Sequence, residues 1–137
     1  MLFRSVRTDG NPLTHAILRG YVNKHGESLP NYHYEDLLLT YHQYLDKGLV
    51  NPAVIVDTNH ANSNKCYLEQ PRIVSEVLHC CRHNDDIHRM VKGFMIESYL
   101  EDGAQKVGDG VFGKSITDPC LGWDKTEELI CRIADQL

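Results

Sequence analysis

The period of the apolar pattern changes along this chain, and that change is the feature that most constrains its fold. Three short apolar runs, at Thr14–Leu18, Ala53–Asp57 and Gly93–Ile96, have the length and composition of β-strands. The segments between them, Tyr34–Lys47 and Leu68–His83, carry apolar residues at helical spacing. Strands that alternate with helices predict βαβ units, and therefore a parallel sheet with right-handed crossovers.

The C-terminal part of the sequence adds one more helix. A glycine-rich segment that ends at Gly113 is predicted to be a loop, and a helix is predicted over Asp124–Leu137. Asp124 and Glu127 have the spacing of a capping box, which predicts that this helix begins at Asp124. The fold class is therefore α/β, with about three βα units and parallel strands, too few to close a barrel but compatible with an arc of one.

The length, charge and cysteine content limit the classes of protein to which this chain can belong. A chain of 137 residues has room for one domain. Its formal net charge of −5, with no block of basic residues, argues against nucleic acid or an anionic membrane as the main partner. No apolar run approaches the ~18 residues of a membrane span. The 5 cysteines, an odd number with no CxxC pair, favour a reducing compartment and a cytoplasmic location.

The first five residues, MLFRS, are expected to be a non-native leader, because one frame of a common sequencing adapter encodes them. Residues 6–137 would then form the domain. Native codons for MLFRS at the genomic locus would contradict this expectation.

Polar side chains follow each predicted strand. Arg19 follows the first, His60 follows the second within VDTNHANSNK, and Glu97 follows the third. Asp118 lies on the loop before the last helix. One imidazole and two carboxylates suit a divalent metal such as manganese, iron or zinc. The alternative is that Glu97 and Asp118 cap neighbouring helices or loops and that His60 is a turn residue.

Five motifs also carry a resemblance to a known family, with that family's order and spacing. The chain resembles the C-terminal part of class I 3-deoxy-D-arabino-heptulosonate 7-phosphate (DAHP) synthase, the first enzyme of the shikimate pathway and of aromatic amino acid biosynthesis. The motifs are GNPLTHAILRG (10–20), PNY (30–32), VDTNHANSNK (56–65), GFMIESYLEDG (93–103) and GKSITDPCLGW (113–123).

The resemblance implies a TIM-type (β/α)8 barrel enzyme that condenses phosphoenolpyruvate with erythrose 4-phosphate and needs a divalent metal of the Mn, Fe, Zn or Co class. His60, Glu97 and Asp118 match three of the family's four metal ligands and are its catalytic residues here. The fourth ligand, a cysteine on the first barrel strand, has no counterpart among the cysteines of this chain. Arg19 matches an arginine that binds the phosphate of phosphoenolpyruvate. Asp118 is also expected near erythrose 4-phosphate.

Lys65 is a further candidate for substrate binding, against the alternative of a solvated lysine at the start of a helix. His79 and His83 are four residues apart on the second predicted helix, but their surroundings match no zinc spacing, so a plain helix surface is expected. Cys120 is expected to be a packed thiol that is not a nucleophile.

Because the family's other phosphate contacts lie on earlier strands, the isolated chain is expected to be catalytically inactive. The resemblance implies small-molecule substrates, no nucleic acid or membrane partner, and a homo-oligomeric parent enzyme. The alternative function is a non-catalytic module, derived from the same barrel, that binds metal or contacts another subunit.

Overall fold

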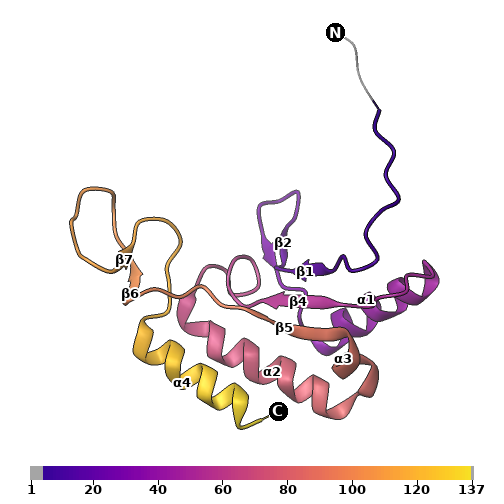
Figure 1. Ribbon diagram of the computed structural model, residues 1–137. Coiled ribbons are helices and arrows are strands. Elements are labelled where there is room, and N and C mark those ends of the chain that lie inside the picture. Colours follow the sequence, from indigo (N-terminus) through magenta and orange to yellow (C-terminus); the bar gives the residue numbers. More distant parts are fainter. Residues whose placement is uncertain (1–4, 137) are drawn as a thin grey trace.

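A three-stranded parallel sheet forms the centre of the protein (Figure 1). The computed structural model describes residues 5–136, so the leader predicted at residues 1–5 lies almost wholly outside the described part. The strands are β1 (Ala16–Leu18), β4 (Val54–Asp57) and β5 (Val91–Met95), in the order β1-β4-β5. Both pairings are parallel, which confirms the prediction of parallel strands.

Four α-helices accompany the sheet within residues 5–136. The helices predicted from periodicity are confirmed as α1 (Tyr34–Asp46), α2 (Gln70–His83) and α4 (Trp123–Ala134), and a 3-10 turn, η1 (Tyr67–Glu69), leads into α2. A further helix, α3 (Asp85–Met90), was not predicted.

The N-termini of helices α3 and α4 are capped in different ways. Helix α3 is short, but the side chain of Asn84 caps it by accepting hydrogen bonds from the N–H groups of Asp86 and Ile87. The capping box predicted at Asp124 is wrong, because the N-cap of α4 is Gly122. Asp124 instead lies in the first helical turn, where its negative charge suits the helix dipole.

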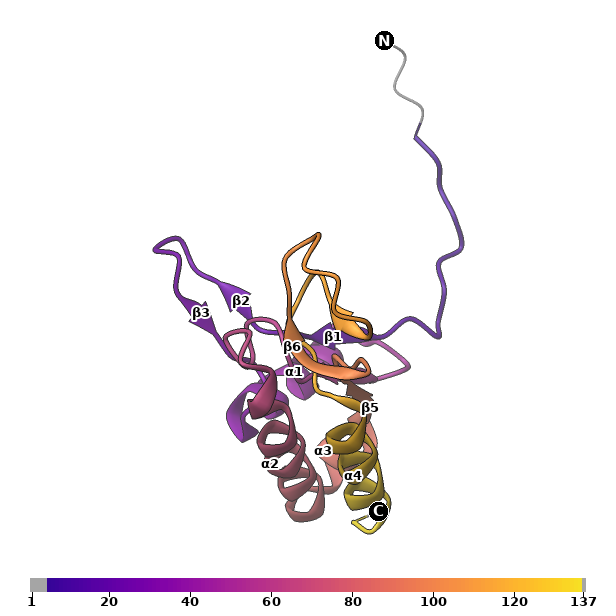
Figure 2. The ribbon, with the colours of Figure 1, turned by 90° about the vertical axis from the view of Figure 1, so that its left-hand side faces the viewer.

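The residues after β1 and the glycine-rich segment predicted as a loop both contain short strands. Residues after β1 form an antiparallel hairpin of β2 (Tyr21–Val22) and β3 (Ser28–Leu29). The glycine-rich segment pairs β6 (Glu101–Ala104) with β7 (Lys114–Ser115) in parallel. Strands of two to four residues are too short to leave a readable alternation in the sequence. Both segments rise on the side away from helices α2 and α4 (Figure 2).

The core lies between the sheet and the helices. Val54 and Val56 of β4 are fully buried against Ile73 and Val77 of α2, together with Leu37 of α1. A second cluster joins α2 to α4 and contains Val74, Leu78, Leu121 and Leu129. The helices are therefore held on the sheet by apolar burial along one face.

The opposite face of the sheet is more open. Side chains alternate along a strand, so Ile17 of β1 and Ile55 of β4 point away from the helices. Ile17 is 43% exposed and Ile55 is half-buried, so this face of the sheet is only partly covered. The same alternation puts Arg19 and Asp57 on the open face, at the carboxyl end of the sheet.

Candidate metal centre

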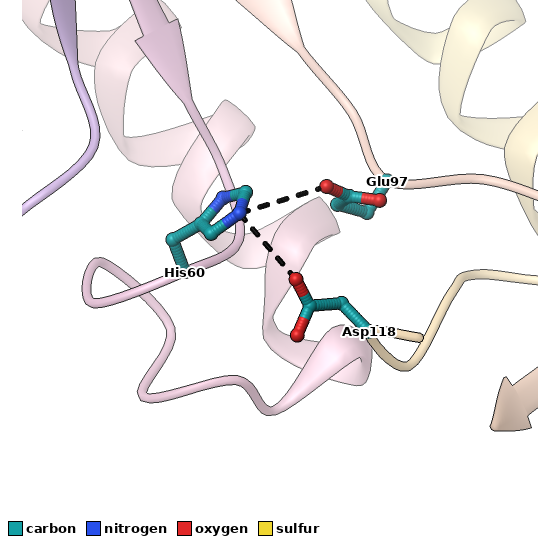
Figure 3. A group of neighbouring side chains, drawn as sticks. All are labelled: His60, Glu97 and Asp118. Carbon is teal, nitrogen blue, oxygen red and sulfur yellow. Dashed lines mark ion pairs between the residues drawn. The ribbon is translucent and has the colours of Figure 1, made fainter. Parts of the chain in front are cut away.

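Three candidate side chains converge at the carboxyl end of the sheet (Figure 3). Nε2 of His60 lies 3.8 Å from Oε1 of Glu97 and 3.6 Å from Oδ2 of Asp118. One donor atom from each residue lies within 4.8 Å of the other two. Residues from two strand ends and a loop, distant in sequence, are thus close together in space.

An unusual loop presents His60. His60, Asn64 and Lys65 have φ angles of 47°, 52° and 59°, in the left-handed region that costs non-glycine residues energy. The amide of Asn62 ties the loop down by donating to the carbonyls of Leu18 and Asp57. Strain at a well-tethered loop is typical of functional sites.

Gly20 allows the loop to sit against the end of β1. A Cβ at Gly20 would lie 2.8 Å from the backbone of Ala61 and Asn62, and the φ of Gly20 is +69°. Only glycine meets both demands without a shift of the loop.

Glu97 is positioned by a buried glutamine. Gln70 is fully buried, and its Oε1 accepts hydrogen bonds from the N–H of Glu97 (2.8 Å) and the hydroxyl of Thr58 (2.9 Å). Its Nε2 donates to the carbonyl of Glu97 at 2.9 Å. One side chain at the start of α2 therefore holds both backbone groups of Glu97. This fixes the position of the chain just after β5.

Asp118 has two distinct partners. Its Oδ1 accepts a hydrogen bond from Nζ of Lys65 at 2.9 Å, while Oδ2 faces His60. The bond from Lys65 is the main reason that the pKa of Asp118 lies below its usual value. Asn59 donates to the carbonyl of Pro119 at 3.3 Å and links the Asp118 loop to the His60 loop.

The chemistry of this group fits a divalent cation. Nδ1 of His60 lies 2.8 Å from Oδ2 of Asp57, and neither of these buried atoms makes a hydrogen bond of normal geometry to any of the described residues. That contact leaves Nε2 and two carboxylate oxygens facing one another. Two ligands about 2.2 Å from one ion lie about 3.1–3.6 Å apart at right-angled to tetrahedral geometry. The distances from Nε2 of His60 to the carboxylates of Glu97 and Asp118, 3.8 Å and 3.6 Å, are close to this range.

A cavity of about 340 Å³ lies beside His60. Its lining includes two cationic side chains, Arg19 and Lys65, with residues of the β2–β3 hairpin. Arg19 is more than half exposed, and its Nε lies 3.7 Å from Oδ2 of Asp57. The arrangement can hold an anion next to a cation-binding group.

Other candidates from the sequence lie elsewhere or are inert. His79 and His83 are exposed on α2 and stack with their ring centroids 4.1 Å apart, outside the His60 group. Cys120 is buried, and burial raises the pKa of its thiol, as expected for a packed, unreactive cysteine. Sequence reasoning missed Asp57 and Gln70. Asp57 carried a visible signal, since it ends the β4 run directly before the polar turn.

Comparison with known proteins agrees with the geometry. Residues 1–130 match the model of the DAHP synthetase I family. The chain is 38% identical over 131 residues to the Trp-sensitive phospho-2-dehydro-3-deoxyheptonate aldolase of Buchnera aphidicola, covering 93% of this chain and 35% of that protein. It is 37% identical over 133 residues to the phospho-2-dehydro-3-deoxyheptonate aldolase of Haemophilus influenzae, covering 95% and 34%.

A solved structure gives the same result. The phospho-2-dehydro-3-deoxyheptonate aldolase of Francisella tularensis SCHU S4 superposes with a TM-score of 0.80 at 28% identity, covering 94% of this chain and 36% of that one. The chain thus spans about a third of the length of these three proteins. The family match covers most of the sequence, and we conclude that the chain belongs to the DAHP synthetase I family.

Proposed function

We propose that this chain is the C-terminal segment of a 3-deoxy-7-phosphoheptulonate synthase, which condenses phosphoenolpyruvate with erythrose 4-phosphate. The observation that carries the proposal is the convergence of His60, Glu97 and Asp118 beside a cavity that contains Arg19 and Lys65. Family membership supports the same reaction.

In this reaction the methylene carbon of phosphoenolpyruvate attacks the aldehyde carbon of erythrose 4-phosphate. Water adds to the other carbon of the enol, and phosphate leaves by carbon–oxygen cleavage. His60, Glu97 and Asp118 would hold a divalent metal of the Mn, Fe, Zn or Co class, and the metal when bound would orient and polarise the aldehyde oxygen.

The cationic side chains have separate roles in the proposal. Arg19 binds the phosphate of phosphoenolpyruvate, because a guanidinium matches the spacing of phosphate oxygens. Lys65 holds Asp118 through its 2.9 Å hydrogen bond and adds positive charge to the same cavity. In the same proposal Asp118 also contacts erythrose 4-phosphate.

The proposed architecture is an arc of a TIM-type (β/α)8 barrel. The β1-β4-β5 order, the parallel pairing and the position of the site at the carboxyl ends of the strands support it. The half-open sheet face that carries Ile17 and Ile55 would then face the interior of the complete barrel. The full enzyme would be a homo-oligomer with small-molecule substrates and no nucleic acid or membrane partner. All 5 cysteines are free thiols, which supports a reducing, cytoplasmic setting.

A second candidate is a non-catalytic module that binds metal or contacts another subunit. The half-exposed apolar face around Ile17 favours a contact with another subunit, as does the edge of β1, which has no strand partner among residues 5–136. The first candidate and the metal-binding form of the second both predict metal binding, and only the first predicts turnover in a completed barrel.

The test measures Mn²⁺ binding and turnover together. In isothermal titration of the 137-residue chain, His60→Ala and Glu97→Ala should each abolish Mn²⁺ binding, whereas His79→Ala, an exposed histidine on α2, should leave it unchanged. Phosphate release that requires both substrates should be absent from the chain alone and should appear when the N-terminal part of a relative is supplied. Arg19→Ala should then mainly raise the KM for phosphoenolpyruvate. Mn²⁺ binding without turnover in the completed barrel would favour the module.

A further inference from the structure

Asp57 has a carboxylate that the proposed chemistry does not yet use. It is the last residue of β4, and its side chain is 1% exposed. We propose that Asp57 is a positioning residue that orients the imidazole of His60 and fixes its tautomer, so that Nε2 is the atom offered to the metal. This inference rests on the proposed function.

The two oxygens of Asp57 have different tasks. Oδ1 accepts a hydrogen bond from the N–H of Asn59 at 2.9 Å, an ordinary turn contact at the end of a strand. Oδ2 lies 2.8 Å from Nδ1 of His60, but neither of these two buried atoms makes a hydrogen bond of normal geometry to any of residues 5–136. A buried charged oxygen without a donor is costly, and Nδ1 of His60 lies nearer to it than Nε of Arg19, which is 3.7 Å away. In the proposal the imidazole ring turns so that its Nδ1–H donates to Oδ2.

This contact determines the tautomer of a neutral His60. A carboxylate only accepts hydrogen bonds, so the ring proton belongs on Nδ1 and the lone pair on Nε2. Nε2 is the atom that faces Glu97 at 3.8 Å and Asp118 at 3.6 Å. Three acceptors with no proton between them repel one another, and a cation at their centre removes the repulsion. In metal sites, a carboxylate commonly holds the histidine ring nitrogen that does not bind the metal, and so orients the ring.

The backbone and the neighbouring arginine are consistent with this role. The left-handed φ of 47° at His60 accompanies the turn that brings its ring back over Asp57, three residues earlier. Arg19 also approaches Oδ2 of Asp57, but at 3.7 Å and with a side chain more than half exposed. The shorter, buried contact to His60 is therefore the stronger one.

Substitution of Asp57 by asparagine distinguishes two roles of this residue: orienting the His60 ring and supporting the turn through Asn59. Asparagine keeps an oxygen for the N–H of Asn59 but can place an NH₂ donor where Oδ2 was. His60 would then accept at Nδ1 and carry its proton on Nε2, the atom required for the metal. A purely structural role would leave the tautomer unchanged.

The experiment uses the 137-residue chain with ¹⁵N-labelled histidine. Long-range ¹⁵N–¹H spectra of the metal-free chain should show His60 protonated on Nδ1, and in Asp57→Asn protonated on Nε2. Titration with Mn²⁺ should show an affinity about 10–100-fold weaker in Asp57→Asn. The control is Asp109→Asn, because Asp109 accepts a backbone hydrogen bond from Lys106 (3.0 Å) in an exposed turn outside the His60 group.

The outcomes separate this inference from the proposed function. An Nε2–H tautomer in the unsubstituted chain would overturn the inference without any variant having to fold. Unchanged Mn²⁺ affinity in a folded Asp57→Asn chain, with binding lost in His60→Ala, would overturn it while leaving the metal centre intact. Unchanged affinity in His60→Ala would overturn the metal centre itself and the role of Asp57 with it.

Discussion

Asp102 shows how one residue couples two distant segments through its charge. Its Oδ1 accepts a hydrogen bond at 2.7 Å from the N–H of Gly122, the N-cap of α4, and its Oδ2 pairs with Nζ of Lys125. The hydrogen bond from Lys125 is the largest cause that lowers the pKa of Asp102, followed by the one from Gly122. The side chain therefore holds β6 to the start of α4.

The sign of the resulting pH dependence follows from the lowered pKa. The ionised form is favoured in the folded chain, so its stabilisation is fully present above the usual aspartate pKa. The stabilisation is lost as the pH falls through the lower, folded value. Because both side chains of the pair are substantially exposed, we expect only a small contribution to stability at neutral pH.

We predict that Lys125→Ala raises the pKa of Asp102 back toward its usual value. A ¹³C titration of the carboxyl group measures this shift directly, and urea denaturation at neutral pH should show the small loss of stability. Lys47→Ala, which removes an exposed lysine with no ion pair among the described residues, is the control. An unshifted Asp102 titration in Lys125→Ala would show that the ion pair does not form in solution.

At the scale of elements, the site depends on how closely the His60 loop packs on the end of β1. Gly20 and Asn62 make that contact, through the missing Cβ of one and the amide of the other. Asn31, which precedes α1, adds a third contact: its backbone N–H donates a hydrogen bond to Oδ1 of Asn62 at 2.9 Å. The loop is therefore fixed by segments that are separate in sequence.

We predict that Gly20→Ala destabilises the chain by about 2–4 kcal/mol, because it adds a backbone clash to the strain of a positive φ. Gly26→Ala is the matched control: its φ is +82°, but nothing lies within 4 Å of the added Cβ. It should cost only about 1 kcal/mol. Urea denaturation measures both values, and Mn²⁺ affinity should fall in Gly20→Ala alone. Equal costs for the two variants would contradict the packing argument.

At the scale of the whole molecule, the open face of the sheet and the unpaired edge of β1 determine how the chain associates with other copies. Within residues 5–136, β1 pairs only with β4, so its other edge has no strand partner. Ile17 on this strand is 43% exposed, and Val107 and Phe112 of the loop after β6 are more than 80% exposed. An unpaired edge strand beside apolar surface promotes association between chains. No helix among the described residues is both long enough and apolar enough to cross a membrane.

We predict that the 137-residue chain associates as its concentration rises and that Ile17→Lys weakens the association about tenfold. Sedimentation velocity over a range of concentrations measures this. Val6→Lys makes the same change in charge at a residue that is 83% exposed in the N-terminal extension, and should have little effect. If both variants weaken association equally, net charge rather than the β1 edge is responsible.

Several features could be predicted from the sequence because they depend on local pattern. The apolar runs and the helical spacing predicted the three strands of the sheet and the helices α1, α2 and α4. The polar ends of those strands, together with the family motifs, singled out His60, Glu97 and Asp118. Period and composition need only neighbouring residues, so they are readable without a structure.

The tertiary structure alone decided how these parts meet. The hairpin of β2 and β3, the pairing of β6 with β7 and the N-cap at Gly122 depend on contacts between distant segments, which no local pattern encodes. The same holds for Gln70 against Glu97 and for Asp57 against the ring of His60. The sequence determined which chemical groups this protein has at its strand ends. Sheet register and helix packing determined the distances between those groups, because a few ångströms decide whether three acceptors can share one cation.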